Sequence, residues 1–378
     1  MKWMHLSDLH LGKRVNEFSM IEDQEYILQR ILEIADEESV DGVLIAGDVY
    51  DKPVPTVDAV RLLDQFLVEL DARGLKVFLI SGNHDSVQRL AFGSRLLRNG
   101  GLYIAPEYDG TLTPVTVDDA FGPIDVYLLP FLKPAHVRRF FPEETIDSYT
   151  DAVRAALRSA ERRPGRRSVL VAHQFVTGAL RSESEEVSVG GLDQVEASAL
   201  EGFDYVALGH IHRPQNMAKG TIRYCGTPLK YSFSEADHKK SVTIVEMREK
   251  GNTTVNTVEL KPLRDMRKIR GTYLEVTARE FYRSFDTGDY IQITLTDEED
   301  IPDAMGKLRI LYPNLMKLSY DNKRTQQEQD VEAAQQVEQK SPLQLFEELY
   351  RIQNNQGMND EQIEASSVLL EKIWEEER

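Results

Sequence analysis

Five short polar fragments, spread over the first 212 residues, constrain the fold of this chain more than any other feature. They contain aspartate, asparagine and histidine, and they hold five of the eight histidines. The fragments are Asp8-Leu9-His10, Gly47-Asp48-Val49-Tyr50-Asp51, Gly82-Asn83-His84-Asp85, Ala172-His173 and Gly209-His210-Ile211-His212. Histidine nitrogen with carboxylate and amide oxygen is a ligand mixture that suits manganese, iron or zinc. A fold that gathers these fragments would create a site for divalent metals.

Short apolar runs alternate with longer amphipathic stretches in the same part of the chain. The runs are residues 2–6, 43–46, 76–80, 126–129, 168–172 and 205–208. Such runs, bounded by turn residues, are typical of strands covered on both faces. The amphipathic stretches predict helices at residues 22–38, 57–73 and 149–162. We therefore expect a layered α/β fold with mixed sheets flanked by helices.

The five fragments lie where five of the predicted strands end. Ligands in such sheets collect beyond the carboxyl ends of the strands, so the fragments should meet at one rim. The predicted metal ligands are Asp8, His10, Asp48, Asn83, His173, His210 and His212. Asp48 follows a glycine in a turn, and its two carboxylate oxygens could bridge two ions. Two adjacent ions are a common device for hydrolysing phosphate esters with a metal-activated water.

His84 has a different predicted role from the other histidines. It adjoins the predicted ligand Asn83 on a tight loop, and neighbouring side chains rarely point to one atom. We therefore expect His84 to act on the substrate side, where it donates a proton or hydrogen bond to the leaving oxygen. A histidine in that role usually needs an acidic residue to orient it. Asp51 is the first candidate for this residue and Asp85 the second.

Composition excludes several classes of protein. The net charge of -18 argues against a general nucleic-acid coat protein, which is usually basic. A single cysteine, Cys225, excludes an intrachain disulfide framework. The first residues lack the uninterrupted apolar stretch that a signal peptide would need, and the sequence has no apolar run long enough to cross a bilayer and no Gly-x-x-x-x-Gly-Lys-Ser/Thr phosphate loop. We expect a soluble cytoplasmic protein that does not hydrolyse ATP by itself.

The later part of the chain predicts a different organisation. Residues 241–247 and 254–260 resemble two outer strands, and residues 262–271 form a basic connector. Residues 272–313 predict a small α/β unit in the order strand, helix, strand, helix. Residues 323–340 are rich in glutamine and glutamate and resemble a linker. Two amphipathic helices are predicted at residues 341–352 and 360–377.

The ordered motifs Asp-x-His, Gly-Asp-x-x-Asp, Gly-Asn-His-Asp, His and Gly-His-x-His resemble those of the calcineurin-like metallophosphoesterase superfamily. Within that superfamily, residues 5–13, 47–53 and 203–233 are similar to the SbcD nucleases. The resemblance is strong over about residues 1–270 and extends to the rest by domain order. It implies three parts: a nuclease domain at residues 1–265, a capping domain that positions DNA at residues 266–322, and a linker with a partner-binding helical hairpin at residues 323–378.

The resemblance also implies a function and a set of partners. It implies a nuclease with two Mn²⁺ ions that acts as a duplex exonuclease and as a single-strand or hairpin endonuclease in DNA repair. The chain would form a homodimer within a heterotetramer, and its C-terminal helices would bind an SbcC-like ATPase. Asp8, His10, Asp48 and His212 would hold one ion, while Asp48, Asn83, His173 and His210 would hold the other. His84 matches the catalytic histidine of the family, but some relatives have a histidine where this chain has Asp51.

A nuclease with this net charge must bind DNA through local basic clusters. Arginines at residues 162–167 form one cluster, and the connector at residues 262–271 forms another. The predicted DNA contacts are Lys13, Arg14, Arg264 and Arg267. Contacts of this kind bind phosphates and do not read bases. Two other functions fit parts of the sequence: a phosphatase or nucleotide phosphodiesterase with a small substrate, and a scaffold that has lost catalysis.

Overall fold

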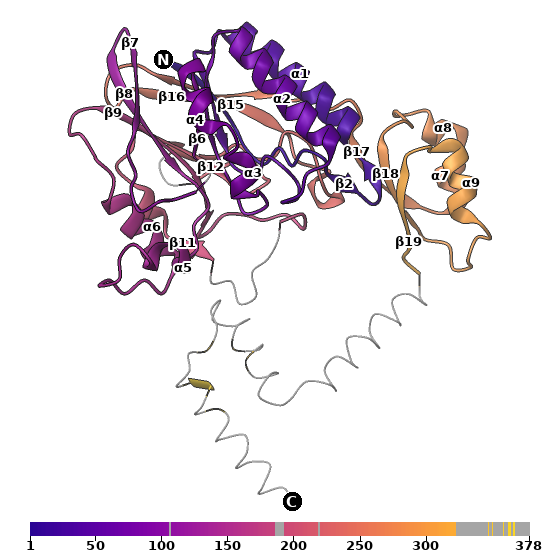
Figure 1. The fold of residues 1–378 in the computed structure, drawn as a ribbon. Helices are drawn as coiled ribbons and strands as arrows, with labels where there is room; N and C mark the ends of the chain where they lie inside the picture. The colour runs from indigo at the N-terminus through magenta and orange to yellow at the C-terminus, as the bar shows by residue number, and fades with distance from the viewer. Residues whose placement is uncertain are drawn as a thin grey trace, which may run out of the picture. The chain divides into compact units, whose positions relative to one another are not determined.

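The computed structural model describes residues 1–105, 107–185, 193–217 and 220–322, together with residues 347, 350, 358, 362, 363 and 366. The chain divides into two compact units (Figure 1). The first comprises Met1–Lys268 and Gly288–Gln292, and the second comprises Ile269–Thr287 and the chain from Ile293 onward. The predicted linker at 323–340 lies outside the described residues, as do all but a few residues of the predicted helices at 341–352 and 360–377.

The first unit contains two six-stranded mixed sheets. One has the strand order β16-β15-β1-β4-β5-β6. Its strands are β1 (Lys2–Leu6), β4 (Gly42–Ala46), β5 (Lys76–Ile80), β6 (Leu102–Ala105), β15 (Ser241–Met247) and β16 (Thr253–Glu259). The four strands from β1 to β6 are parallel, whereas β15 and β16 extend the sheet in antiparallel fashion. All five residues of β4 are buried, as expected for a parallel strand that is covered on both faces.

The second sheet has the strand order β13-β14-β12-β9-β8-β7. Its strands are β7 (Val115–Asp119), β8 (Gly122–Leu129), β9 (Arg167–His173), β12 (Tyr205–Gly209), β13 (Gln215–Asn216) and β14 (Ile222–Tyr224). The central strands β8, β9, β12 and β14 are parallel, and the two edge strands are antiparallel. Both sheets therefore have parallel centres whose strands end at a common edge.

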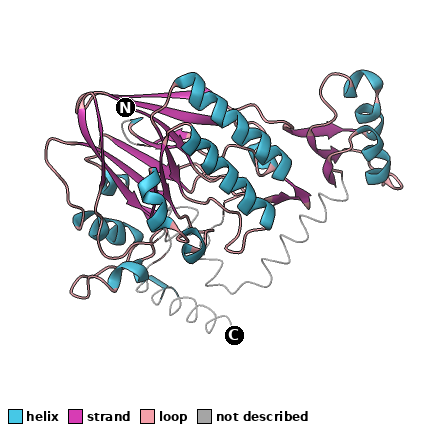
Figure 2. Cartoon of the chain, turned by 45° about the horizontal axis from the view of Figure 1, so that its top comes forward, coloured by secondary structure: helices cyan, strands magenta, loops and turns pink. Residues whose placement is uncertain are grey.

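The two sheets pack face to face. Trp3, Phe78 and Ile80 of the first sheet share one hydrophobic cluster with Val171 and Tyr205 of the second sheet. A second cluster joins the other face of the second sheet to α5 (Pro134–Arg138) and α6 (Tyr149–Arg158). On the first sheet, α1 (Ile21–Glu38) and α2 (Val57–Ala72) cover the outer face (Figures 1 and 2). The predicted layered α/β fold, with mixed sheets and helices outside, is confirmed.

The second unit differs in detail from the prediction. It contains α7 (Tyr273–Thr277), α8 (Arg279–Tyr282) and α9 (Ala304–Leu311), together with most of a sheet in the order β17-β18-β19, of which the first three residues of β17 and of β18 belong to the first unit. Its strands are β17 (Met266–Gly271), β18 (Tyr290–Leu295) and β19 (Leu315–Tyr320). The predicted order of strand, helix, strand, helix from residue 272 was wrong, because the first strand precedes that residue and a capping box of Thr272 and Glu275 begins a helix there. The sequence did not predict this strand, because its basic residues resemble those of an exposed connector.

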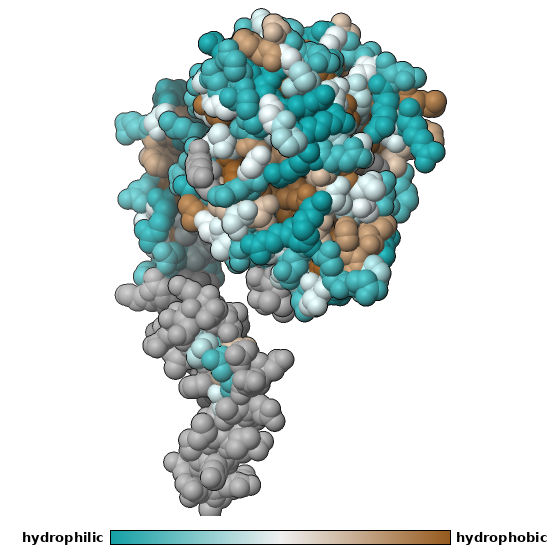
Figure 3. All heavy atoms as spheres, turned by 90° about the vertical axis from the view of Figure 1, so that its left-hand side faces the viewer, coloured by the Kyte–Doolittle hydropathy of each residue, from teal (hydrophilic) through white to brown (hydrophobic). Residues whose placement is uncertain are grey.

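The face drawn in Figure 3 shows hydrophilic residues with smaller apolar areas between them. No helix in the described part of the chain is both long enough and apolar enough to cross a membrane.

Candidate metal centre

The five polar fragments meet at the carboxyl ends of β1, β4, β5, β9 and β12. Main-chain hydrogen bonds join the loops after β1 and β4, from Asp8 N to Gly47 O and from His10 N to Asp48 O, both at 3.0 Å. The amide of His210, after β12, donates to Asp8 Oδ1 at 3.0 Å and thereby joins the two sheets. The predicted convergence at one rim therefore occurs in the structure.

Two glycines allow the loops to approach one another closely. A Cβ atom on Gly82 would lie 2.0 Å from Asp48 Oδ1, and one on Gly209 would lie 1.9 Å from the main-chain oxygen of Ala46. Contacts this short exclude any side chain. The glycine before Asn83 and the glycine before His210 are therefore required by packing between the loops, as well as by turn formation.

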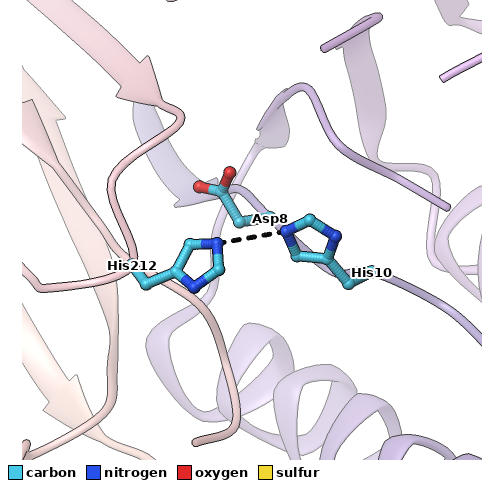
Figure 4. Close-up of side chains that lie close together, drawn as sticks. All are labelled: Asp8, His10 and His212. Carbon is cyan, nitrogen blue, oxygen red and sulfur yellow. Dashed lines mark hydrogen bonds between the residues drawn. The ribbon is translucent and has the colours of Figure 1, made fainter. Parts of the chain in front are cut away.

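The first group of candidate ligands consists of Asp8, His10 and His212. The two imidazole rings point toward each other across a short gap, with the Asp8 side chain beside them (Figure 4). His10 Nε2 and His212 Nε2 are 3.2 Å apart. All three side chains are buried. Facing nitrogens beside a carboxylate form an arrangement that can hold one cation.

The second group contains Asp48, Asn83, His173 and His210. Asn83 Oδ1 lies 3.1 Å from His173 Nε2 and 2.9 Å from His210 Nδ1. Asp48 Oδ2 lies 3.3 Å from His173 Nε2 and 3.9 Å from His10 Nε2. Asp48 is therefore the side chain that contacts both groups, as a bridging ligand would.

Burial and neighbouring charges act differently on the buried groups. Burial lowers the pKa of His10 well below its usual value and lowers that of His210 to about 3. Burial and the neighbouring Asp48 raise the pKa of Asp8. For Asp48 burial also favours the protonated form, but the adjacent histidines outweigh it and hold the pKa well below the usual range. Burial thus favours the neutral form of His10 and His210, which is the form that can bind a cation.

The donor set fits a pair of divalent cations. Two carboxylates are completely or almost completely buried in this site, and a buried carboxylate must be paired with positive charge or bind a metal. His173 Nδ1 lies 2.7 Å from Ala46 O, so this nitrogen donates to the carbonyl and Nε2 is directed toward Asp48. A histidine held in this way is oriented for metal binding.

Four of the seven predicted ligands have a left-handed backbone. The φ angles of Asp8, His10, Asp48 and His210 are 52°, 44°, 49° and 99°. Such conformations cost about 1–3 kcal/mol for each residue other than glycine, and they are concentrated at functional sites. The surrounding sheets must offset this strain.

His84 is oriented by a main-chain group. Its Nδ1 lies 3.1 Å from the carbonyl oxygen of Asp51, and its Nε2 lies 4.0 Å from Asp48 Oδ2. The prediction that the Asp51 carboxylate orients His84 is corrected here, since this carboxylate lies 2.8 Å from Lys13 Nζ and 3.8 Å from His10 Nδ1. The side chain of His84 is 17% exposed, compared with 3% or less for His10 and His212. Although His84 could also join a metal group with His10 and Asp48, its exposure favours contact with substrate.

Asp85, the second candidate for orienting His84, contacts other groups. Its carboxylate accepts hydrogen bonds from the main-chain amides of Val49, Tyr50 and Gly82 at 2.9–3.1 Å. Burial and the neighbouring Asp48 raise its pKa to about 6. Asp85 therefore joins the loop after β4 to the loop after β5.

A cavity of about 170 Å³ opens beside the second ligand group. Its lining includes Asn83, Phe131, Lys133 and His136. The Phe131 ring stacks on His210 with ring centroids 6.3 Å apart. The cavity thus combines an aromatic wall with Lys133 next to the candidate metal ligands, and the carboxylates of Asp85 and Glu107 also line it.

The residues predicted to contact DNA all have partners within the chain. Lys13 pairs with Asp51, and Arg14 donates to the carbonyl of Glu17. Arg267 pairs with Asp289 at 3.0 Å. These partners mean that each basic group would have to exchange or share its contacts in order to bind a phosphate.

Arg264 is held in a dense network in the first unit. It lies 2.7 Å from Asp23 Oδ2, 2.5 Å from Glu22 Oε2 and 3.2 Å from Tyr290 Oη. Asp23 is completely buried and also accepts from Tyr290 Oη at 2.7 Å. Burial lowers the pKa of Arg264, but these partners outweigh it and raise the pKa above its usual range. The network indicates a structural role for Arg264.

Sequence reasoning missed the residues that support His212. Its Nδ1 contacts Ser184 Oγ, and its main-chain amide donates to Glu185 Oε1 at 2.7 Å. Glu235 and Lys240 are buried behind Ser184. Both lie in a polar stretch that resembles an exposed loop, so no local pattern reveals their burial.

Comparison with known proteins places the chain in a family. The family model described as calcineurin-like phosphoesterase matches residues 1–214, and the model described as type 5 capsule protein repressor C-terminal domain matches residues 262–354. A Staphylococcus epidermidis protein, named as the SbcD subunit of the nuclease SbcCD, is 30% identical over the full length of both chains. Its counterpart in Staphylococcus saprophyticus is 33% identical over 84% of each chain.

Solved structures give more distant matches. A dimetal phosphatase from Danio rerio is 12% identical and has a TM-score of 0.41, covering 69% of this chain and 98% of that one. The E. coli phosphoesterase Yfce is 13% identical with a TM-score of 0.27, covering 69% of this chain and all of that one.

The fold and the clustered ligands define a layered α/β protein of the phosphoesterase type. From the family model and the full-length relatives, the chain belongs to the calcineurin-like phosphoesterases and, among them, to the family of the SbcD subunits of SbcCD nucleases.

Proposed function

We propose that this protein is a DNA nuclease that hydrolyses phosphodiesters with two Mn²⁺ ions in complex with an SbcC-like ATPase. We further propose that it degrades duplex ends as an exonuclease and cuts single strands and hairpins as an endonuclease, in DNA repair and recombination in the cytoplasm. The observation that carries the proposal is the contact of two ligand groups through Asp48, beside a partly exposed His84. The names of the full-length relatives support the substrate class.

In this proposal Asp8, His10, Asp48 and His212 hold one ion, and Asp48, Asn83, His173 and His210 hold the other. When bound, the ion pair would activate a water and neutralise charge that develops on the phosphate. Neutral imidazoles at His10 and His210 leave their lone pairs available. The carbonyl of Asp51 fixes the His84 ring, so that Nε2 in its protonated form can donate to the leaving oxygen.

The DNA would extend from the metal centre over neighbouring surfaces. The cavity lined by Phe131 and Lys133 is suited to the group next to the scissile phosphate, because an aromatic ring can stack and a lysine can bind phosphate. The proposed backbone contacts are Lys13, Arg14 and Arg267, whereas the network around Arg264 favours a structural role for that residue. We also propose that residues 266–322 cap the DNA and that residues 1–265 carry the catalytic site.

Self-association and partner binding belong to the same proposal. Residues 323–378 would bind the ATPase, which the chain needs because it lacks a phosphate loop of its own. Two chains would form a homodimer within a heterotetramer. Apolar side chains exposed on and after α2 and near α4 (Ser94–Leu97) support a protein contact there; they include Val57, Val60, Phe92 and Leu96.

The decisive experiment is Mn²⁺-dependent cleavage of a labelled hairpin-ended duplex by the wild type and by His84→Gln. We expect the wild type to cut and the variant to lose activity by about 10²–10⁴-fold, the usual contribution of a general acid. Both proteins should bind two Mn²⁺ ions in calorimetry. If the wild type leaves DNA intact but hydrolyses a small aryl phosphodiester, the protein is a small-substrate phosphodiesterase and the nuclease proposal is wrong.

A truncated chain tests the partner. A protein of residues 1–322 should retain Mn²⁺-dependent cleavage and lose any stimulation by ATP in the presence of the ATPase. Unchanged stimulation would show that residues 323–378 are not the docking segment.

A further inference from the structure

A chain of polar side chains, which begins at the half-buried Ser184 and continues to buried Glu235 and Lys240, leads away from His212 on the side opposite the metal centre. Ser184 Oγ lies 2.7 Å from His212 Nδ1 and 2.5 Å from Glu235 Oε1. Lys240 Nζ lies 2.5 Å from the other oxygen of Glu235. Glu235 is completely buried and Lys240 is 3% exposed. An ion pair enclosed this fully costs desolvation energy and contributes little net stability, which favours a role in positioning.

The direction of each hydrogen bond follows from the available protons. The ammonium group of Lys240 has three N–H bonds, and its three partners are Glu235 Oε2, Thr227 Oγ1 and the main-chain oxygen of His212. Glu235 Oε2 lies 2.5 Å from the Lys240 ammonium group, so Glu235 is the carboxylate of a buried ion pair. Glu235 is therefore ionised and can only accept hydrogen bonds.

Ser184 has one proton and contacts two groups. Because Glu235 can only accept, the Ser184 hydroxyl donates to Glu235 Oε1. Ser184 Oγ must then accept from His212, which requires the ring proton to be on Nδ1. Nε2 is left with a lone pair, and this is the nitrogen that faces His10 Nε2 at 3.2 Å.

We propose that Lys240, Glu235 and Ser184 are positioning residues that hold His212 in the tautomer with the proton on Nδ1 and Nε2 free for the cation. The inference rests on the proposed metal centre and extends it to residues that contact neither metal nor substrate. Lys240 also donates to the carbonyl of His212 itself, so the same network fixes both the ring and the main chain of this residue. Each member has its partner, which is the condition under which a buried polar network is rigid.

The tautomer can be measured in the metal-free full-length protein. Nitrogen-15 NMR of labelled histidine rings distinguishes Nδ1–H from Nε2–H, and the His212→Asn variant identifies the signals of His212. We expect wild-type His212 to have its proton on Nδ1 and Ser184→Ala to contain a mixture of both tautomers. An Nε2–H tautomer in the wild type would overturn the proposal.

Metal affinity is a second measurement that does not require nuclease activity. Mn²⁺ titration by calorimetry should show one of two ions bound about 10–100-fold more weakly in Ser184→Ala, the usual effect of losing a hydrogen-bond partner of a ligand histidine. Ser184→Thr, which keeps the hydroxyl, should restore the affinity. The matched control is Ser182→Ala, since the Ser182 hydroxyl has no hydrogen-bond partner among the described residues. Equal affinity in Ser184→Ala and the wild type would refute the inference.

A double variant tests the role of the buried ion pair between Glu235 and Lys240. Glu235→Gln alone leaves the Lys240 charge without a counter-ion and could prevent folding, so Glu235→Gln is combined with Lys240→Met. We expect the double variant to fold, to lose the fixed tautomer and to bind one Mn²⁺ ion more weakly. If the double variant folds and His212 keeps the wild-type tautomer, the orientation of the Ser184 hydroxyl does not depend on Glu235. This result would refute the proposed positioning role of Glu235 and Lys240. A wild type that binds two ions but cuts no DNA would reject the proposed function and leave this inference intact.

Discussion

The residues of the metal centre are held in conformations that their own backbones disfavour. Asp8, His10, Asp48 and His210 all have positive φ, and the carboxylates of Asp8 and Asp48 are buried. Both features cost folding free energy. The packing of the two sheets offsets this cost, and the close approach of the loops depends on glycines that have no side chain to displace.

Gly209→Ala tests this requirement at a single position. The new methyl group would lie 1.9 Å from Ala46 O, so β4 and β12 must move apart. We expect a loss of about 3 kcal/mol in the free energy of unfolding, at the upper end for overpacking, together with weaker Mn²⁺ binding. Urea denaturation and calorimetry measure the two effects.

The control is Gly100→Ala. Its nearest atom would be 3.8 Å away, and its φ is not in the left-handed region, so we expect no clear change in stability. If Gly209→Ala is as stable as Gly100→Ala, the loops are not packed as described.

At the scale of elements, one side chain joins the loops that follow β4 and β5. Asp85 accepts from three main-chain amides in these loops and so fixes Asp48 relative to Asn83. Asp85→Ala should lower the free energy of unfolding by about 3 kcal/mol, because it leaves buried amides without acceptors. Asp85→Asn, with one remaining acceptor oxygen, should lie between this variant and the wild type. Equal stabilities for Asp85→Ala and the wild type in urea denaturation would contradict this role.

Substitution of Arg264 can distinguish a structural role of this residue from a contact with DNA. Arg264→Met leaves Tyr290 as the one remaining partner of the buried Asp23 carboxylate among the described residues, and it should cost about 3 kcal/mol, as for other broken buried ion pairs. The exposed pair of Arg248 and Glu246 provides a control, since Arg248→Met should change stability by less than about 1 kcal/mol.

The same variants separate the two roles of Arg264 in binding. If Arg264 contacts a DNA phosphate, Arg264→Met should reduce the slope of log affinity against log salt concentration by about 1. We expect an unchanged slope with reduced stability. A reduced slope with unchanged stability would instead support the prediction from sequence that Arg264 contacts DNA.

At the scale of the whole molecule, exposed apolar side chains predict a dimer. Phe92 is 89% exposed and Leu96 is 81% exposed. We expect light scattering to give a dimer for the wild type and a monomer for the combined variant Phe92→Asp and Leu96→Asp, because buried carboxylates oppose association. Ile310→Asp is the matched control, since Ile310 is similarly exposed on α9 and should leave the dimer intact. A dimer in both variants would exclude this surface.

The sequence by itself predicted the central strands of both sheets and the polar side chains that gather at their carboxyl ends. Five of the six short apolar runs end in a polar fragment, and strands in parallel sheets collect ligands at their carboxyl ends, so both the layered fold and the meeting of the fragments were predictable. The motifs also indicated the family. These features depend on short motifs or on the periodic spacing of apolar residues, and both can be recognised in the sequence without the structure.

Only the tertiary structure decided which atoms contact these ligands. The carbonyl of Asp51 holds His84, and the carboxylate of Asp51 pairs with Lys13. Glu235 and Lys240 look like exposed charges in the sequence, yet they are buried behind His212. Such contacts join residues that are far apart in the chain, and they depend on how loops pack between two sheets. The pattern of a sequence indicates which face of a helix or strand is buried and where a strand ends. The partner of each buried polar atom is set instead by three-dimensional packing.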